Sequence, residues 1–322
     1  QSQRKALISY IKQRLLSNMT RRQETPNKIF KTIEALDENA LTIGFARRFA
    51  TYKRAHLLFN DLERLSSIVN KENMPVQFIF AGKAHPADKA GQDLIKNIVD
   101  ISKRKEFNGR VIFLEDYDME LGRMLTQCVD IWLNTPTRPL EASGTSGQKA
   151  VLNGVMNFSV LDGWWAEGYI PEAGWALKEE KTFDNQLFQD ELDAETIYST
   201  FENEIIPLFY NRNKDGVPVE WVKYVKKCIA GIAPHFTNKR MLDDYIRQYY
   251  TKIIDRFNSF TQDNYAEARE YAEWKSRVIR GWDSIEIVKK DVINTADESL
   301  LLGQVFKAEI SIDLNELANS DF

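Results

Sequence analysis

Short apolar runs alternate with segments of helical periodicity through the first half of the chain. The runs typical of buried strands cover residues 40–45, 76–81, 111–114, 129–133 and 158–161. Apolar residues recur every three or four positions at about 52–69, 86–101 and 119–128, and a short helix is predicted over 147–153. Because strands and helices alternate, the pattern predicts a doubly wound α/β fold, a Rossmann-like parallel sheet with helices on both faces.

The segments around this core have a different pattern. Residues 5–18 predict an amphipathic helix, and the polar neighbours of Pro26 predict a loop. Three tryptophans among Gly and Pro residues predict a turn-rich aromatic loop after Gly163, and about 185–271 are mostly helical with a break at 215–218. Residues 305–314 alternate as a strand does. We therefore divide the chain into a helical lead-in (1–38), a Rossmann-like domain with a helical extension (39–280) and a partial β tail (281–322).

Composition narrows the possible functions. The 322 residues are 43% hydrophobic and carry a net charge of −4, so a substantial core can form and general nucleic-acid binding is disfavoured. Cys128 and Cys228 have no metal or redox spacing, which favours a reduced, cytoplasmic setting. No apolar run approaches the roughly 20 residues of a membrane helix. His56 and His235 suit packing or surface roles, His85 can face a site, and the three are too scattered for a metal.

A turn rich in small residues spans 139–154 and joins the strand near 129–133 to a helix start. Ser143 to Gly147 let a ligand approach the backbone, where free N–H groups and the helix dipole attract an anion. Glu141 and Lys149 bracket this turn with opposite charges. An ordinary tight turn accounts for the pattern equally well.

Four cations, Arg47, Arg48, Lys53 and Arg54, occupy eight positions where the first strand should end, and no acid lies between Asn39 and Asp61. Cations are unfavourable at the start of a following helix unless an anion lies between them. Arginine offers a planar fork to phosphate oxygens and lysine a compact charge, so the pattern favours a phosphate-type ligand. A solvated basic helix face is the alternative.

Four segments of this sequence, 40–54, 80–86, 138–154 and 159–169, resemble the α-glucan (glycogen, starch and maltodextrin) phosphorylases of the shorter bacterial type. The resemblance covers about residues 1–280 and only the C-terminal half of the family's chain. It implies the GT-B glycosyltransferase architecture, with this chain as the second Rossmann-like domain. The N-terminal domain of the same enzyme would then be its partner.

The resemblance also implies roles for individual residues. Lys149 matches the lysine that holds pyridoxal 5′-phosphate covalently, and Arg48 and Lys53 match the residues that bind the reacting inorganic phosphate. The positions matching the rest of the cofactor pocket are Arg47, Tyr117, Thr145 and Ser146. Those matching the glucosyl-binding positions are Glu141, Ser143 and Gly144, with Tyr52 nearby. One departure is that Ser146-Gly147-Gln148 stands where the muscle-type pattern has Gly-Asn-Met.

The implied reaction is phosphorolysis of an α-1,4-glucan by inorganic phosphate, giving glucose 1-phosphate with retained configuration. We expect the isolated chain to be inactive, with the cofactor absent or loosely held, because half of the cleft is missing. A sugar-nucleotide-dependent glucan synthase on the same fold is one alternative, although such enzymes often carry a carboxylate where this chain has Lys149. A non-catalytic glucan-binding module is another, in which Trp164 and Trp165 stack on sugar rings instead of packing in the protein.

Overall fold

The computed structural model describes residues 2–177, 183, 185–292 and 308–318. Its contacts divide the chain into two units, Gln1–Arg240 and Met241–Phe322. Every residue predicted to belong to the site lies in the first unit. The domain boundaries expected near residues 38 and 280 stay a prediction.

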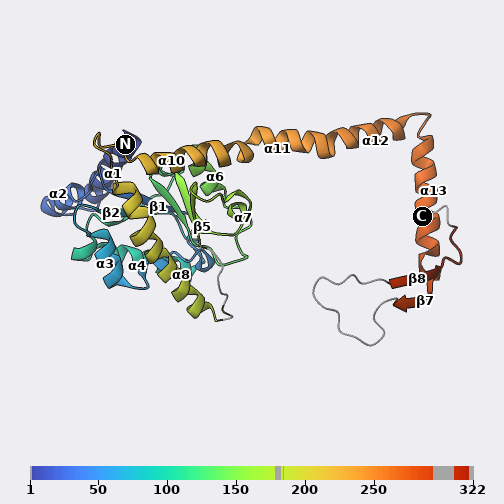
Figure 1. The fold of residues 1–322 in the computed structure, drawn as a ribbon, viewed down its shortest axis with the longest axis horizontal. Helices are drawn as coiled ribbons and strands as arrows, with labels where there is room; N and C mark the ends of the chain where they lie inside the picture. The colour runs from blue at the N-terminus through green and yellow to red at the C-terminus, as the bar shows by residue number, and fades with distance from the viewer. Residues whose placement is uncertain (1, 178–182, 184, 293–307, 319–322) are drawn as a thin grey trace. The chain divides into compact units, whose positions relative to one another are not determined.

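A six-stranded parallel sheet forms the centre of the first unit (Figure 1). Its strands are β1 (Leu41–Ala46), β2 (Val76–Ala81), β3 (Val111–Leu114), β4 (Ile131–Asn134), β5 (Met156–Val160) and β6 (Gly174–Leu177). Their spatial order is β3-β2-β1-β4-β5-β6. The predicted doubly wound fold is confirmed. Because the strand order reverses between β1 and β4, the carboxyl ends of these two strands open the crevice where such folds bind ligands.

Helices cover both faces of the sheet (Figure 1), as the buried and apolar strands require. The α-helices of this unit are α1 (Ser2–Arg21), α2 (Pro26–Glu34), α3 (Leu62–Val69), α4 (Lys89–Ser102), α5 (Met119–Cys128), α6 (Thr145–Leu152), α7 (Trp164–Gly168), α8 (Gln186–Thr200), α9 (Ile206–Tyr210) and α10 (Val219–Lys227). Phe78 of β2 packs edge-on against Phe201, with ring centroids 5.4 Å apart, on the face that α8 covers. Leu7 and Ile11 of α1 are buried with Trp132 on the opposite face.

The helical lead-in is held to the sheet by a buried ion pair. Arg4 Nη1 donates to both carboxylate oxygens of Asp130, at 2.8 and 3.0 Å, and Arg4 Nε donates to the carbonyl oxygen of Glu38. Asp130 immediately precedes β4 and also accepts the backbone N–H of Thr42 in β1. The lead-in is therefore bound to the two strands that flank the crevice.

The second unit contains α12 (Thr251–Thr261), α13 (Ala266–Gly281) and an antiparallel pair, β7 (Glu286–Val292) with β8 (Ala308–Asp313), while α11 (Asn238–Tyr245) begins in the first unit. The predicted small β tail is confirmed. Residues 305–307 of the predicted strand lie outside the described residues. None of the described helices combines the length and the apolar character that crossing a bilayer requires.

The helix predicted over 52–69 is wrong in its first half. Thr51–Lys53 and Leu57–Phe59 form short 3-10 turns, and α-helix starts only at Leu62. Between them Arg54 has a φ of 48°, a left-handed conformation that an α-helix cannot continue. The buried contacts of Arg54 hold this backbone conformation against the local helical periodicity.

Two other segments also differ from the prediction. Pro26 opens helix α2 where a loop was expected, because the fixed φ of proline suits the first turn of a helix. Strand β6 and helix α7 lie in the segment that was expected to be an aromatic loop. The edge strand β6 approaches β5 so closely at Gly174 that a Cβ there would lie 2.6 Å from the carbonyl oxygen of Asn157.

The core of the sheet predicts a large effect for one substitution. Leu133 in β4 is 2% exposed, and Leu133→Ala should lower the free energy of unfolding by about 2–5 kcal/mol because it leaves a cavity. Urea denaturation measures the change. Leu187→Ala is the matched control, since Leu187 is 76% exposed and should change the free energy by less than about 0.5 kcal/mol. Equal effects of the two substitutions would contradict this description of the core.

Candidate active site

The crevice between β1 and β4 brings together segments that are distant in sequence. Arg47 and Arg48 directly follow β1, and Thr135 directly follows β4. The turn before α6 belongs to the same connection as Thr135, and the backbone N–H of Thr137 donates to the carbonyl oxygen of Tyr52. The two predicted segments, the basic one and the one rich in small residues, are therefore in contact.

A carboxylate holds two of the predicted cations. Glu141 Oε2 accepts a hydrogen bond from Arg47 Nη2 at 2.7 Å and another from Lys53 Nζ. The side chain of Glu141 is 12% exposed, that of Arg47 is 8% exposed and that of Lys53 is 9% exposed. No hydrogen bond to Glu141 Oε1 is found in the described part of the chain, so this oxygen is left for another donor.

This ion-pair cluster differs from the arrangement expected from the sequence. The cations were expected to lack an acid and to face the start of an α-helix. In the structure the acid comes from Glu141, 94 residues after Arg47, and the segment at Thr51–Lys53 is a single 3-10 turn. No α-helix therefore begins among these cations, and their excess of positive charge over Glu141 is what favours a further anion.

Arg47 retains hydrogen-bonding capacity that the described residues do not satisfy. Its Nε and Nη1 are buried, and neither has an acceptor within the described residues. Burial lowers the pKa of Arg47 below its ordinary value even though Glu141 acts in the opposite direction. Buried donors without an acceptor cost about 1–3 kcal/mol each, so an anion beside Arg47 would offset that cost. This is the clearest sign of a phosphate position in the crevice.

Tyr52 and Arg48 belong to the same cluster. Lys53 Nζ lies 4.4 Å from the centre of the Tyr52 ring. Burial alone would raise the pKa of Tyr52, but the neighbouring Lys53 and Arg48 cations lower it below its ordinary value. The cluster thus contains three cations, of which Arg47 and Lys53 contact the one carboxylate, Glu141, and it has an excess of positive charge.

Residues that follow α6 in the chain hold the turn that carries Glu141 in place. Asp162 accepts the backbone N–H of Glu141 at 2.9 Å, and the N–H of Trp164 donates to the carbonyl oxygen of Ser143 at 2.8 Å. Gly144 caps the helix in a left-handed conformation, with a φ of 86°. Trp164 and Trp165 are 3% and 0% exposed, so the packing interpretation of this pair is confirmed.

Helix α6 has one exposed and one buried face. Thr145 and Lys149, four residues apart, lie on the same face and are exposed, whereas Gly147 is buried. Ser146 Oγ accepts a hydrogen bond from the indole of Trp132 at 3.3 Å. A Cβ at position 147 would lie 2.7 Å from Nε1 of Trp164, so the packing of Trp164 against α6 favours glycine here.

Tyr117 lies on the loop after β3, and its contacts are with α5. Its hydroxyl packs against Gly122 of α5, and burial, with Asp118 as a second cause, raises the pKa of Tyr117. His85 is exposed, and its Nδ1 accepts the backbone N–H of Ala87. Among the described residues, no group of three His, Cys, Asp or Glu side chains has the arrangement of a metal site.

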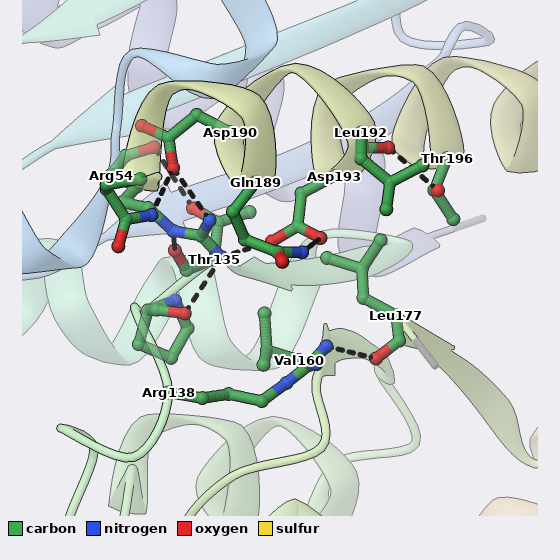
Figure 2. Close-up of polar contacts among 12 residues, drawn as sticks. Arg54, Thr135, Arg138, Val160, Leu177, Gln189, Asp190, Leu192, Asp193 and Thr196 are labelled. Carbon is green, nitrogen blue, oxygen red and sulfur yellow. Dashed lines mark hydrogen bonds and ion pairs between the residues drawn. The ribbon is translucent and has the colours of Figure 1, made fainter. Parts of the chain in front are cut away.

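Arg54, which was not assigned a role from sequence, anchors the segment after β4 to helix α8 (Figure 2). Its Nε and Nη2 donate to the carbonyl oxygens of Thr135 and Pro136 at 2.9 and 3.0 Å. Its guanidinium also pairs with Asp190 at 2.9 Å and Asp193 at 2.7 Å, both on α8. Thr135 Oγ1 in turn donates to the carbonyl oxygens of Lys53 and Arg54. The backbone of Lys53 is thereby fixed to the end of β4.

Part of this anchor could have been found in the sequence. Asp190 and Asp193 are three residues apart in a helical segment and therefore share a face. Nothing in the sequence, however, indicates that this face meets Arg54, which lies more than 130 residues earlier. His56, which was expected to pack or to lie on the surface, also joins the anchor, because its Nε2 lies 2.9 Å from Asp190 Oδ2.

A comparison with protein families agrees with this geometry. The model of the carbohydrate phosphorylase family matches residues 9–172, which are 164 of the 322 residues. The chain belongs to this family. The matched residues include β1 to β5, the basic segment and the whole turn before α6, so the family assignment rests on the elements that build the crevice.

Several curated phosphorylases are similar to this chain. It is 41% identical to a maltodextrin phosphorylase of Thermococcus litoralis over 294 residues, which are 91% of this chain and 34% of that protein. It is 47% identical to a glycogen phosphorylase of Aquifex aeolicus over 248 residues, 77% of this chain and 35% of that protein. The chain thus spans about a third of the length of these phosphorylases.

The Arg54 anchor predicts a pH dependence of stability. Burial acts to raise the pKa of Asp190, but hydrogen bonds from His56, Arg54 and Gln186 outweigh it and the pKa lies below the ordinary value. The unfolded state therefore takes up the proton first as the pH falls. The stabilisation is complete above the unfolded pKa of about 3.9 and is lost as the pH falls through the lower, folded value.

Urea denaturation of the wild type and of Asp190→Asn between pH 7 and pH 3 measures this contribution. The wild type should be the more stable protein at pH 7, and the difference should shrink toward pH 3. Glu191→Gln, an exposed neighbour on the same helix, is the control and should differ little from the wild type throughout. A difference that stays constant with pH would show that the charge of Asp190 is not what stabilises the fold.

Proposed function

We propose that the protein carrying this sequence is an α-1,4-glucan phosphorylase, which cleaves the glucan with inorganic phosphate and releases glucose 1-phosphate. The observation that supports this most strongly is the cluster of Arg47, Lys53 and Glu141, in which two buried arginine nitrogens lack an acceptor among the described residues. It lies within the residues that match the carbohydrate phosphorylase family.

In this proposal, different residues of the chain bind the inorganic phosphate and the sugar. Arg48 and Lys53, the two cations beside Tyr52, bind the inorganic phosphate. Glu141, through Oε1, and the backbone at Ser143 and Gly144 bind glucosyl hydroxyls. Glu141 serves as a hydrogen-bond acceptor, since its Oε2 already accepts from Arg47 and Lys53, and the proton comes from the inorganic phosphate.

Pyridoxal 5′-phosphate fits the remaining groups of the crevice. Lys149 would hold it covalently, with Arg47 and the backbone N–H groups of Thr145 and Ser146 on its phosphate and Tyr117 lining the pocket. The unsatisfied Nε and Nη1 of Arg47 are the features that agree with this assignment. When bound, the cofactor supplies its 5′-phosphate beside the substrate phosphate, in contrast to its usual use as an electron sink.

The charges explain how the reaction proceeds. Two phosphates in contact repel each other unless they share a proton and cations surround them, and Arg47, Arg48 and Lys53 provide that surrounding. The inorganic phosphate donates its proton to the glycosidic oxygen as the bond from that oxygen to the anomeric carbon breaks. A phosphate oxygen then bonds to the same face of that carbon, which gives glucose 1-phosphate with retained configuration.

The substrate and the reaction place demands on the rest of the enzyme. Excluding water from the phosphates requires a closed cleft, and the chain spans only about a third of the curated phosphorylases. We therefore propose that a further domain of the same enzyme completes the glucan site, and that the 322 residues alone are inactive. A cytoplasmic location fits a reaction that consumes inorganic phosphate and yields a sugar phosphate.

Labelling of Lys149 tests the cofactor assignment. Treatment of the full protein with pyridoxal 5′-phosphate and borohydride should leave a reduced adduct on Lys149, located by mass spectrometry of the peptides. Lys149→Ala should abolish both the adduct and phosphorolysis, and Lys83→Ala, an exposed lysine after β2, should keep both. Sugar transfer from a nucleotide donor without an adduct would support the synthase alternative. Glucan affinity with neither activity would support a binding module.

Lys53 provides a test of the phosphate position. Lys53→Ala should lower kcat/KM for inorganic phosphate by about 100-fold or more, because a buried cation aimed at the transferring phosphate is lost. The affinity for glucan in the absence of phosphate should change little. Initial rates at varied phosphate and a glucan-binding assay measure the two effects. A loss confined to glucan affinity would place Lys53 in the sugar site and contradict the assignment.

A further inference from the structure

A second cavity lies on the first unit, apart from the crevice. Its volume is about 400 Å³, within the range of about 300–1,000 Å³ typical of small-molecule sites. It runs along β3, the edge strand that pairs only with β2, and is bounded by α1 and α2 on one side and α4 on the other. None of the residues assigned to the proposed active site lines it.

The inner walls of this edge cavity are apolar. Leu15 and Met19 of α1, Leu36 after α2 and Val111 of β3 are all buried at its boundary. Phe113 of β3 adds a partly buried aromatic ring. The walls therefore suit a flat apolar group of a ligand more than a polyhydroxylated sugar.

The rim of the edge cavity has an excess of positive charge. Its cations are Arg22, Lys28, Lys31, Lys103 and Lys105, against the two carboxylates of Glu24 and Glu115. Both carboxylates are already paired, Glu24 with Lys28 and Glu115 with Arg22. Neither Lys31 nor Lys105 has an ion pair or side-chain hydrogen bond among the described residues. The rim therefore favours a ligand that is an anion, and the apolar walls favour a ligand that also carries an apolar group.

The edge cavity is coupled to a loop of the proposed active site. Arg22 Nη1 lies 2.5 Å from the Glu115 carboxylate, which lines the cavity and precedes Tyr117 by two residues. Arg14 donates to the carbonyl oxygens of Glu115 and Asp116, and Arg21 pairs with Asp116 at 2.9 Å. Arg14, Arg21 and Arg22 therefore hold this loop, and Arg22 also lines the rim of the edge cavity.

We propose that the edge cavity binds a small phosphomonoester with an aromatic group, and that its phosphate competes with Glu115 for Arg22. The ring lies against the wall formed by Leu15, Met19 and Leu36, and the phosphate lies at the rim near Lys31 and Lys105. Binding loosens the hold of α1 on the loop that carries Tyr117. The site is separate from the proposed phosphate position, because its walls belong to the edge strand β3 and the crevice opens between β1 and β4.

Calorimetry with two probes, phenyl phosphate and 1-naphthyl phosphate, tests this site. Both should bind the protein with a Kd below about 1 mM. Inorganic phosphate, which lacks the ring, and phenol, which lacks the charge, should each bind at least about tenfold more weakly, since each keeps only one of the two recognised groups. The double substitution Lys31→Glu with Lys105→Glu should weaken both probes by at least about tenfold, because two exposed rim cations become anions.

Two control variants distinguish a specific site from a general effect of charge and from binding in the crevice. Lys71→Glu with Lys96→Glu changes the net charge equally at exposed positions outside the edge cavity, and should leave probe binding within about twofold of the wild type. Lys53→Ala, which disables the proposed active site, should also leave it unchanged. No binding at millimolar probe, equal losses in both double variants, or a loss with Lys53→Ala would overturn the proposal. Because no step measures phosphorolysis, failure here leaves the proposed function standing.

Discussion

The crevice depends on one buried charge. Arg54 is 3% exposed, and a guanidinium removed from water to that extent is tolerated only where its donors are met by acceptors. It obtains them from two carbonyls after β4 and two carboxylates of α8. Three segments separated by many residues are thereby fixed in one arrangement. The alternative, an unpaired buried cation, is costly enough that the loops have little freedom to rearrange.

The neighbour of Arg54 benefits from this rigidity. Lys53 shares the same turn, so its backbone is fixed by Thr135 while its ammonium group reaches Glu141. Arg47 approaches that carboxylate from the end of β1. A preorganised cluster with excess positive charge in a poorly hydrated crevice attracts anions more strongly than the same charges in water. The same turn thus carries Arg54, which forms the anchor, and Lys53, which belongs to the ion-pair cluster.

Arginine performs a similar task at the edge of the sheet. Arg14, Arg21 and Arg22 extend from α1 and the residue after it to the loop that follows β3, and they bind its carbonyl and carboxylate oxygens. In both places a planar guanidinium bridges loops that would otherwise be held only by their strand ends. The difference is exposure. The Arg54 pairs are buried, whereas the side chains of Arg21 and Arg22 are exposed.

The sequence by itself determined the first five strands of the sheet, most helices, the doubly wound class and the two segments that meet at the crevice. Those features depend on local periodicity and on strand ends, which the order of residues along the chain specifies. Only the tertiary structure decided that Arg54 breaks the predicted helix and that Glu141 pairs with both Arg47 and Lys53. These outcomes depend on contacts between residues about 90 to 140 positions apart, whose energies override local preference and leave no periodic pattern in the sequence.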